Sequence, residues 1–357
     1  MIERCSLHAA AGWLLLLSLV PASSVAAPQK TRTVIDNLGR SITVPARIER
    51  VLSLQPEITR IIVALGAADR LAGIDHFLRT NDPLFKIIAP GQDRLPLVSM
   101  ADYNVNMEMV LRLAPEAIFG APEDRTVVEA LQSKTGIPTI ALSSQGRFDR
   151  LIAEIGLLGS VLDRSERAAE LIAFFQAGIE AVRTRIREAV PQPKPRVYLA
   201  FWGSPTRTPV HYEPVDAAGA VNVAENLLPS FLGTLIANVN LETIIAWDPD
   251  VILVHGNYPI HQRAVTTASF LSDGRLASLK AVGAGRVHYT FGFWNWWDPA
   301  EVLFETEYLA RLFHPGLFPG FDLESRGNAI FKKFYGVERA FSILSATIGC
   351  GAWLDAR

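Results

Sequence analysis

The sequence has few cysteines and no run of basic residues, and both absences exclude a class of protein. Only 2 of its 357 residues are cysteines, too few for the disulfide framework of a small secreted domain. The chain has 34 Lys and Arg residues against 36 Asp and Glu residues, and its formal net charge is -2. Nucleic-acid binding needs a concentrated basic surface, so we expect no nucleic-acid partner. With 49% hydrophobic residues, the chain is also not disordered, and its length suits about two domains.

Catalytic and metal-binding motifs are missing as well. The chain contains no GxSxG nucleophile elbow, no GxGxxG loop and no Walker loop, which disfavours the main alternative class, an exported two-domain α/β enzyme. The histidines are scattered without HxH or HExxH spacing, so direct capture of zinc or manganese is not expected. Haem ligation through one side chain, such as His76, Tyr103 or Tyr212, needs no motif and stays open. We therefore expect a binding protein without catalytic residues, a cofactor or a metal centre of its own.

The first 27 residues differ from the rest of the chain. Residues 9–20 form an apolar run after Arg4, and residues 21–27 are rich in small side chains. This is the pattern of a secretory signal peptide. A membrane anchor needs roughly 20 apolar residues, and this run has about 12. We expect cleavage after Ala26 or Ala27 and a periplasmic mature protein.

Short apolar runs bounded by turn residues recur along the chain, as in the buried strands of parallel sheets. They lie at 51–54, 117–120, 139–142, 197–201, 251–255 and 287–290. Helical patterns ended by Gly or Pro lie between them, at 58–65, 107–113 and 241–247. The alternation predicts an α/β fold with helices on both faces of each sheet.

One helical pattern is much longer than the others. It runs from Asp163 to about Val190 without a proline, and Asp163 and Glu166 stand at capping-box spacing. Its apolar positions follow a 4-3-4-3-4 spacing, at Ala168, Ile172, Phe175, Ile179, Val182 and Ile186. Gly178 is the one helix breaker and costs about 1 kcal/mol relative to Ala. A helix of about 25 residues would be roughly 37 Å long, so the pattern predicts a rigid strut between two lobes.

Two segments on either side of this helix resemble each other. Residues 104–118 read NVNMEMVLRLAPEAI, and residues 238–252 read NVNLETIIAWDPDVI. Both copies precede a predicted strand, which predicts two lobes of similar topology. Each copy has a glutamate at the start of its helix, Glu108 or Glu242, where a negative charge suits the helix dipole. The predicted division is a signal peptide, a first lobe, a helical segment that includes the strut, and a second lobe, at residues 1–27, 28–147, 148–190 and 191–357.

Several segments, in this order, carry a resemblance to a known family. They are DNLGRSITVP at 36–45, RVLSLQP at 50–56, ALGAADRLAGI at 64–74, the paired glutamate segments, AVNVA at 220–224 and LARLFHP at 309–315. The chain resembles a periplasmic solute-binding protein of an ABC importer, of the class III branch that serves iron-siderophores, haem, cobalamin and some oxyanions. The resemblance covers nearly the whole mature chain. It implies two Rossmann-like α/β lobes joined by a single long α-helix, with a ligand cleft between the lobes and modest hinge closure.

The resemblance also implies a partner. In the family, one glutamate on each lobe docks onto arginines of the membrane permease, and the matching positions here are Glu108 and Glu242. Two exposed carboxylates at a fixed separation suit two basic pockets on a dimeric partner. We therefore expect a monomeric receptor that docks on an inner-membrane ABC permease dimer with its ATPase. The chain departs from the pattern of this family at one place: it has Thr59-Arg60 where many relatives carry Thr-Glu.

Ligands of such folds sit outside the carboxyl ends of the strands, so the loops there predict the binding residues. Aromatic rings on these loops suit catecholate, porphyrin or corrin faces, and arginines suit the charge of a ferric siderophore or an oxyanion. The candidates are Trp202, Trp294, Trp297, Tyr103, Tyr289, His76, Arg79, Arg125 and Arg207, and Trp296 lies on the same predicted loop as Trp294 and Trp297. A metal complex, above all a ferric siderophore, is the favoured ligand. Haem, cobalamin and molybdate or tungstate are the alternatives.

Overall fold

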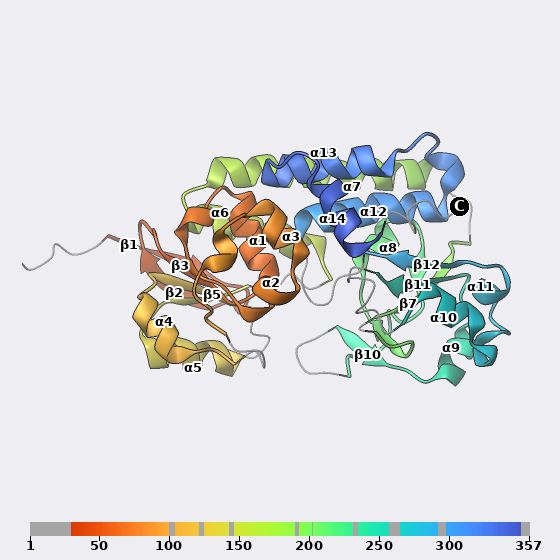
Figure 1. Ribbon diagram of the computed structural model, residues 1–357, viewed down its shortest axis with the longest axis horizontal. Helices are drawn as coiled ribbons and strands as arrows, with labels where there is room; N and C mark the ends of the chain where they lie inside the picture. The colour runs from red at the N-terminus through yellow and green to blue at the C-terminus, as the bar shows by residue number, and fades with distance from the viewer. Residues whose placement is uncertain are drawn as a thin grey trace, which may run out of the picture.

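The fold has two groups of parallel strands joined along one side by long helices (Figure 1). The structure is a computed structural model that describes residues 30–99, 104–120, 125–142, 146–189, 193–201, 203–230, 235–256, 265–291 and 298–350. The predicted α/β architecture with two lobes is confirmed. Within the described residues, no helix is long and apolar enough to cross a membrane.

The first lobe contains a 4-stranded parallel sheet in the order β4-β3-β5-β6. Its strands are fully buried, which explains why they read as short apolar runs rather than alternating patterns. An antiparallel hairpin of β1 and β2 precedes the sheet. The elements are β1 (Thr31–Ile35), β2 (Ser41–Pro45), β3 (Val51–Ser53), α1 (Pro56–Ala64), η1 (Ala68–Arg70), β4 (Leu71–Gly73), α2 (His76–Asn81), α3 (Pro83–Ile88), η2 (Gln92–Arg94), α4 (Met107–Leu113), β5 (Ala117–Gly120), α5 (Arg125–Thr135), β6 (Thr139–Ala141) and α6 (Phe148–Val161).

The second lobe repeats this topology. Its 4-stranded parallel sheet has the order β12-β11-β7-β9. If the strands of each 4-stranded sheet are counted along the chain, the first one (β3 or β7) lies between the second and the third in both sheets. A second antiparallel pair, β8 with β10, stands beside the sheet. The elements are β7 (Arg196–Ala200), β8 (Arg207–Pro209), α8 (Glu213–Ala217), β9 (Val221–Asn222), β10 (Ile236–Asn238), α9 (Leu241–Trp247), β11 (Val251–His255), α10 (Thr267–Ser272), η4 (Gly274–Leu276), α11 (Lys280–Gly283), β12 (Val287–Thr290), α12 (Pro299–Phe313), η5 (Pro315–Leu317), α13 (Leu323–Tyr335) and α14 (Ala340–Ile348).

The predicted strut is the helix α7 (Ser165–Ala189), with 25 residues. The predicted capping role of Asp163 is wrong, because Asp163 has φ 51°, the left-handed conformation that ends α6, and its carboxylate pairs with Arg32. Gly178 has a packing reason. A Cβ built there would lie 2.6 Å from the Cδ1 of Leu303 in α12, so a side chain at this position would force the end of the Leu303 side chain to shift.

The long helices make one continuous core between the lobes. The largest apolar cluster includes residues of both sheets and of α6, α7, α12, α13 and α14. Helices α13 and α14, which follow the second sheet in the chain, contact α1 and α3 of the first lobe. Two smaller clusters belong to one lobe each and lie beneath α4 and α5 in the first lobe and beneath α9 to α11 in the second.

A buried ionic network also crosses between the lobes. Arg60 of α1 donates to Asp82 at 2.9 Å and to Glu301 of α12 at 3.0 Å, and all three side chains are buried. Asp298, at the start of α12, accepts a hydrogen bond from Tyr335 of α13. Arg60 therefore neutralises carboxylates of both lobes.

Candidate functional site

The sequence repeat corresponds to a repeated structural unit, formed by a short helix and the strand after it. Asn106 caps α4 by accepting from the backbone N–H of Met109 at 3.0 Å, and Asn240 caps α9 by accepting from that of Thr243 at 2.8 Å. Each helix ends at a residue other than glycine that has the left-handed backbone conformation, Ala114 after α4 and Asp248 after α9. The two helices have the predicted bounds because the asparagine caps and the apolar spacing act locally.

The strand after each helix is held by an equivalent carboxylate. Glu116 accepts from the backbone N–H of Arg50 at 3.0 Å, and Asp250 accepts from that of Arg196 at 2.9 Å. In both lobes this contact lies where the first strand of the sheet begins. The two units are therefore built alike at both ends of the helix and at the entry into the sheet.

Each unit exposes its glutamate. Glu108 and Glu242 are the second residues of α4 and α9, and both are exposed. In the described part of the chain, neither carboxylate takes part in an ion pair. In Figure 1, α4 and α9 lie in different lobes, both at the bottom of the view, with α7 at the top. Their exposure leaves both carboxylates accessible to a partner.

The carboxyl edge of the first sheet holds buried acids that were not expected from the sequence. Glu57 follows β3 and Asp75 follows β4, and their side chains are almost fully buried. Within the described residues, one oxygen of each carboxyl group has no hydrogen-bond partner. Burial raises the pKa of Glu57 well above its usual range and raises the pKa of Asp75 to about 7. Both groups therefore hold a proton in weakly acidic solution.

His76 and Arg79, two of the predicted binding residues, lie in α2 directly after Asp75. The backbone N–H of His76 donates to the Ser99 hydroxyl at 2.9 Å, and the side chain is half-buried. The Arg79 guanidinium donates to the carbonyl of Leu95. Both residues lie close in the chain to the carboxyl end of β4.

Arg125, Arg207 and Tyr289 lie in different surroundings. Arg125 is exposed at the start of α5 and pairs with Glu129 at 3.2 Å, so its charge is already partly neutralised. Arg207 is half-buried in β8. Tyr289 is half-buried in β12, and its carbonyl accepts from the hydroxyl of Tyr308 at 2.9 Å. Four further candidates, Trp202, Trp294, Trp297 and Tyr103, lie outside the described residues, as does Trp296.

The carboxyl edge of the second sheet holds a buried group of aromatic and polar residues. His255, the last residue of β11, is 4% exposed and stacks on Phe201, with ring centroids 4.9 Å apart. Glu305 of α12 accepts from the hydroxyl of Tyr212 at 3.3 Å and from the backbone N–H of Phe291 at 3.0 Å. Burial raises the pKa of Glu305 to about 8. In this group, the sequence had indicated only Tyr212, as a possible haem ligand, and His255, as the end of an apolar run.

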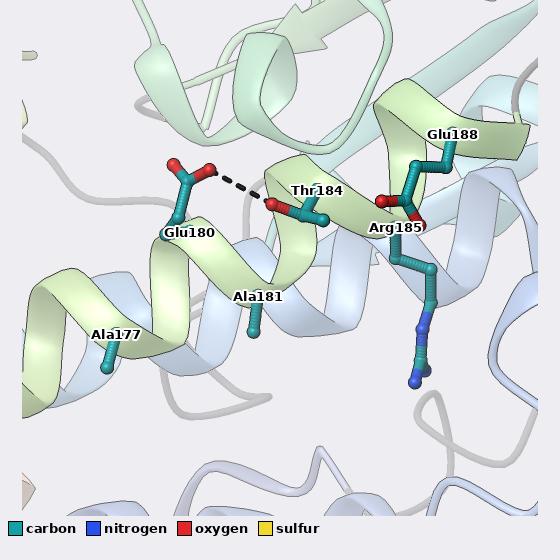
Figure 2. A pocket seen from close by; sticks show the side chains of 6 residues that line it. All are labelled: Ala177, Glu180, Ala181, Thr184, Arg185 and Glu188. Carbon is teal, nitrogen blue, oxygen red and sulfur yellow. Dashed lines mark hydrogen bonds between the residues drawn. The ribbon is translucent and has the colours of Figure 1, made fainter.

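Helix α7 carries a surface groove of about 500 Å³ (Figure 2). Its lining comes from this one helix, at Ala177, Glu180, Ala181, Thr184, Arg185 and Glu188. The Thr184 hydroxyl donates to the Glu180 carboxylate at 3.0 Å (Figure 2). A groove on one face of a single helix does not enclose a ligand, so we do not assign it as the binding site. Among the described residues, no three His, Cys, Asp or Glu side chains are grouped so that they could hold a metal ion.

The repeated topology defines a protein of two similar α/β lobes. Residues 51–291 match the family described as periplasmic binding protein, and the chain belongs to this family. The relatives in this comparison are substrate-binding proteins of ABC transporters, so the chain is an extracytoplasmic binding protein and not an enzyme.

Individual relatives differ in their ligands. The chain is 26% identical over 349 residues to the molybdate-binding protein MolA of Haemophilus influenzae, and the alignment covers 90% of this chain and 94% of MolA. The solved structure of MolA bound to molybdate has a TM-score of 0.72 and 22% identity, and covers 86% of this chain and 98% of that one. CeuE of Helicobacter pylori, in its Ni-His complex, has a TM-score of 0.71 and 16% identity, and covers 87% of this chain and 97% of that one. Because similar scores come from proteins with different ligands, the fold does not identify the ligand.

Proposed function

We propose that the protein is the periplasmic receptor of an ABC importer for a compact metal oxyanion, of which molybdate and tungstate are the simplest members. The observation that carries the ligand class is the match with MolA, which extends over almost the full length of both chains. The receptor is exported with residues 1–27 as its signal peptide and binds the anion between its lobes. It then delivers the anion to the permease.

The repeated glutamate units support the delivery step. Glu108 and Glu242 stand at equivalent places on two similar lobes, and α7 joins the lobes through a continuous core. A rigid connection holds two docking charges at a constant separation, which suits a dimeric membrane partner. Complementary charge also raises the rate of encounter with that partner.

The carboxyl edges of the two sheets support the binding step. In both sheets the strand order reverses beside the first strand, and ligands of open α/β sheets bind at this point. Arg79 and Arg207 are the candidates for neutralising the anion, and His76 and Tyr289 are candidates for donating hydrogen bonds to it. Arg125 is the weaker candidate because it already pairs with Glu129. Trp202, Trp294, Trp297 and Tyr103 remain candidates for a wall of the site.

A ferric siderophore is the second candidate ligand. The sequence that favours it is the run of tryptophans at Trp294, Trp296 and Trp297, because stacked aromatic rings suit a large catecholate complex better than a small tetrahedral anion. Haem and cobalamin make the same demand on aromatic area.

The ligand class is tested by titrating the mature protein with molybdate, tungstate, a ferric catecholate siderophore, haem and cobalamin, with sulfate as the control anion. We expect molybdate and tungstate to raise the melting temperature. At a free concentration about 100 times Kd, the stabilisation is about 2.7 kcal/mol. Tight binding of the siderophore with no response to molybdate would replace the oxyanion by the second candidate. No response to any of the five ligands would reject the proposed ligand class altogether.

A further inference from the structure

We infer that each lobe docks on the permease through a contact of two parts: the exposed carboxylate and an apolar side chain one helical turn further along the same helix. The pairs are Glu108 with Leu111 on α4, and Glu242 with Ile245 on α9. This inference rests on the docking function proposed above and adds the apolar half of the contact.

The two apolar side chains are exposed at equivalent positions of the repeat. Leu111 is 52% exposed and Ile245 is 37% exposed, and each follows its glutamate by three residues. A single exposed leucine is ordinary on a protein surface. Here an apolar side chain is exposed at the same place in both lobes, next to a glutamate in each. Such a repeat is expected if the two sites share a binding role.

The opposite face of each helix fixes these pairs in position. Val110 of α4 is fully buried in the first lobe's own apolar cluster, and Ile244 of α9 is fully buried in that of the second lobe. Residues three apart in a helix lie on one face, so the glutamate and the apolar side chain project together. Asn106 and Asn240 cap the two helices and hold the start of this face.

The chemistry of the pairs specifies the partner surface. Both carboxylates are exposed and, within the described residues, not ion-paired, so each can meet a positive charge of a partner. Leu111 and Ile245 gain stability only if the partner covers them with apolar atoms. Because the unit occurs twice on similar lobes, the matching partner has two equivalent halves. Each half of the permease dimer would therefore present an arginine or lysine beside an apolar hollow.

The test measures binding of the full receptor to the permease and ATPase complex of its own organism, reconstituted in phospholipid nanodiscs. Leu111→Ala with Ile245→Ala removes the apolar part, and Glu108→Lys with Glu242→Lys reverses the charges. Ile343→Ala, at a side chain 47% exposed on α14, is the matched control for loss of an exposed apolar residue. Thermal melting of each variant confirms that it is folded.

We expect the apolar double variant to weaken the affinity at least about tenfold, mainly through faster dissociation, with an unchanged dependence on salt. The charge-reversed variant should bind more slowly, and added salt should no longer weaken its binding, because the salt then screens a repulsion. Leu111→Ile with Ile245→Leu should retain the affinity, and Ile343→Ala should have no effect.

Two outcomes separate the inference from the function on which it rests. If the charge-reversed variant fails to dock while Leu111→Ala with Ile245→Ala binds like the wild type, the docking function stands and the apolar contact is wrong. If neither double variant changes the affinity, the proposed docking function is itself wrong.

Discussion

The two lobes have the same topology and the same glutamate-bearing unit, but their carboxyl edges differ. The first edge holds Glu57 and Asp75, each with a carboxyl oxygen that lacks a partner in the described residues. The second edge holds His255 stacked on Phe201, and a Glu305 whose two oxygens both accept hydrogen bonds. A symmetric partner requires two similar docking units, whereas one small ligand between the lobes requires no symmetry. The comparison therefore supports our proposal that the similar regions contact the transporter and the dissimilar regions contact the ligand.

The largest effect is expected at Arg60 of the first lobe, because its ion pairs join the two lobes. Arg60→Met leaves the buried carboxylates of Asp82 and Glu301 without their cation, so we expect a loss of about 3–5 kcal/mol in the free energy of unfolding. The measurement is urea denaturation. Arg147→Met, which breaks an exposed pair with Asp149, is the control and should cost less than about 1 kcal/mol.

A second variant distinguishes loss of charge balance from loss of packing. Arg60→Met combined with Asp82→Asn and Glu301→Gln removes the charges together, so it should be more stable than Arg60→Met alone. Equal stability of the single and triple variants would contradict the role of the network as a bridge of charges.

The buried acids at the two carboxyl edges should contribute to the free energy of unfolding over different ranges of pH. Burial raises the pKa of Asp75 to about 7 in the folded protein, against about 3.9 in the unfolded chain. Asp75 therefore contributes stability below about pH 4, and this contribution is lost as the pH rises toward 7. Asp75→Asn should flatten this part of the stability curve and raise stability at pH 8 by roughly 2–4 kcal/mol. Asparagine keeps the oxygen that accepts from the Leu78 N–H.

Glu305→Gln is the matched variant for the second edge. Because the pKa of Glu305 is raised to about 8, its loss of stability should extend to higher pH than that of Asp75. Thermal melting between pH 4 and 9 measures both variants. A wild-type curve that rises through this range, or one that neither substitution alters, would contradict the assignment of these two groups as buried neutral acids.

A smaller difference in stability should separate two glycines at which another helix contacts the strut α7. A Cβ built at Gly159 of α6 would lie 2.4 Å from the Cβ of Ala168, while one at Gly178 would meet the end of the Leu303 side chain. Ala168 has no rotamer with which to withdraw, so we expect Gly159→Ala to cost about 2–3 kcal/mol and Gly178→Ala about 1 kcal/mol. Urea denaturation measures both variants. Equal losses would show that Leu303 is held as rigidly as Ala168.

The fold was largely predictable because its signals are local. Buried strands appear as apolar runs, and Asn106 and Asn240 mark the start of their helices in the chain itself. The short strands β9 and β10 carry no such signal because two or three residues show no periodicity. Asp163 was misassigned because the end of α6, two residues before α7, takes the left-handed conformation there.

The site was less predictable because its contacts join distant parts of the chain. Arg60 and Glu301 are 241 residues apart, and no local pattern relates them. Glu57 and Asp75 look like ordinary helix-start acids, and only the packing around them shows that they are buried. The exposed glutamates were predictable because the repeat itself identifies them.

The smallest expected difference lies between the two docking units. The first has an exposed arginine, Arg112, four residues after Glu108, while the second has Ala246 at the equivalent place. The positive charge of Arg112 repels the basic side chain of the permease that Glu108 attracts, so Glu108 contributes less to docking than Glu242 does. Glu242→Gln should therefore weaken docking more than Glu108→Gln. An i,i+4 charge pair is worth about 0.2–0.5 kcal/mol, which corresponds to about a twofold change in affinity.

Arg112→Ala should remove this inequality, and Arg150→Ala serves as a control for loss of an exposed arginine elsewhere. Titrations of nanodisc-embedded transporter at low and physiological salt measure the effect, which should shrink as salt screens the charges. A larger loss from Glu108→Gln would show that Arg112 assists docking and that the two units bind dissimilar halves.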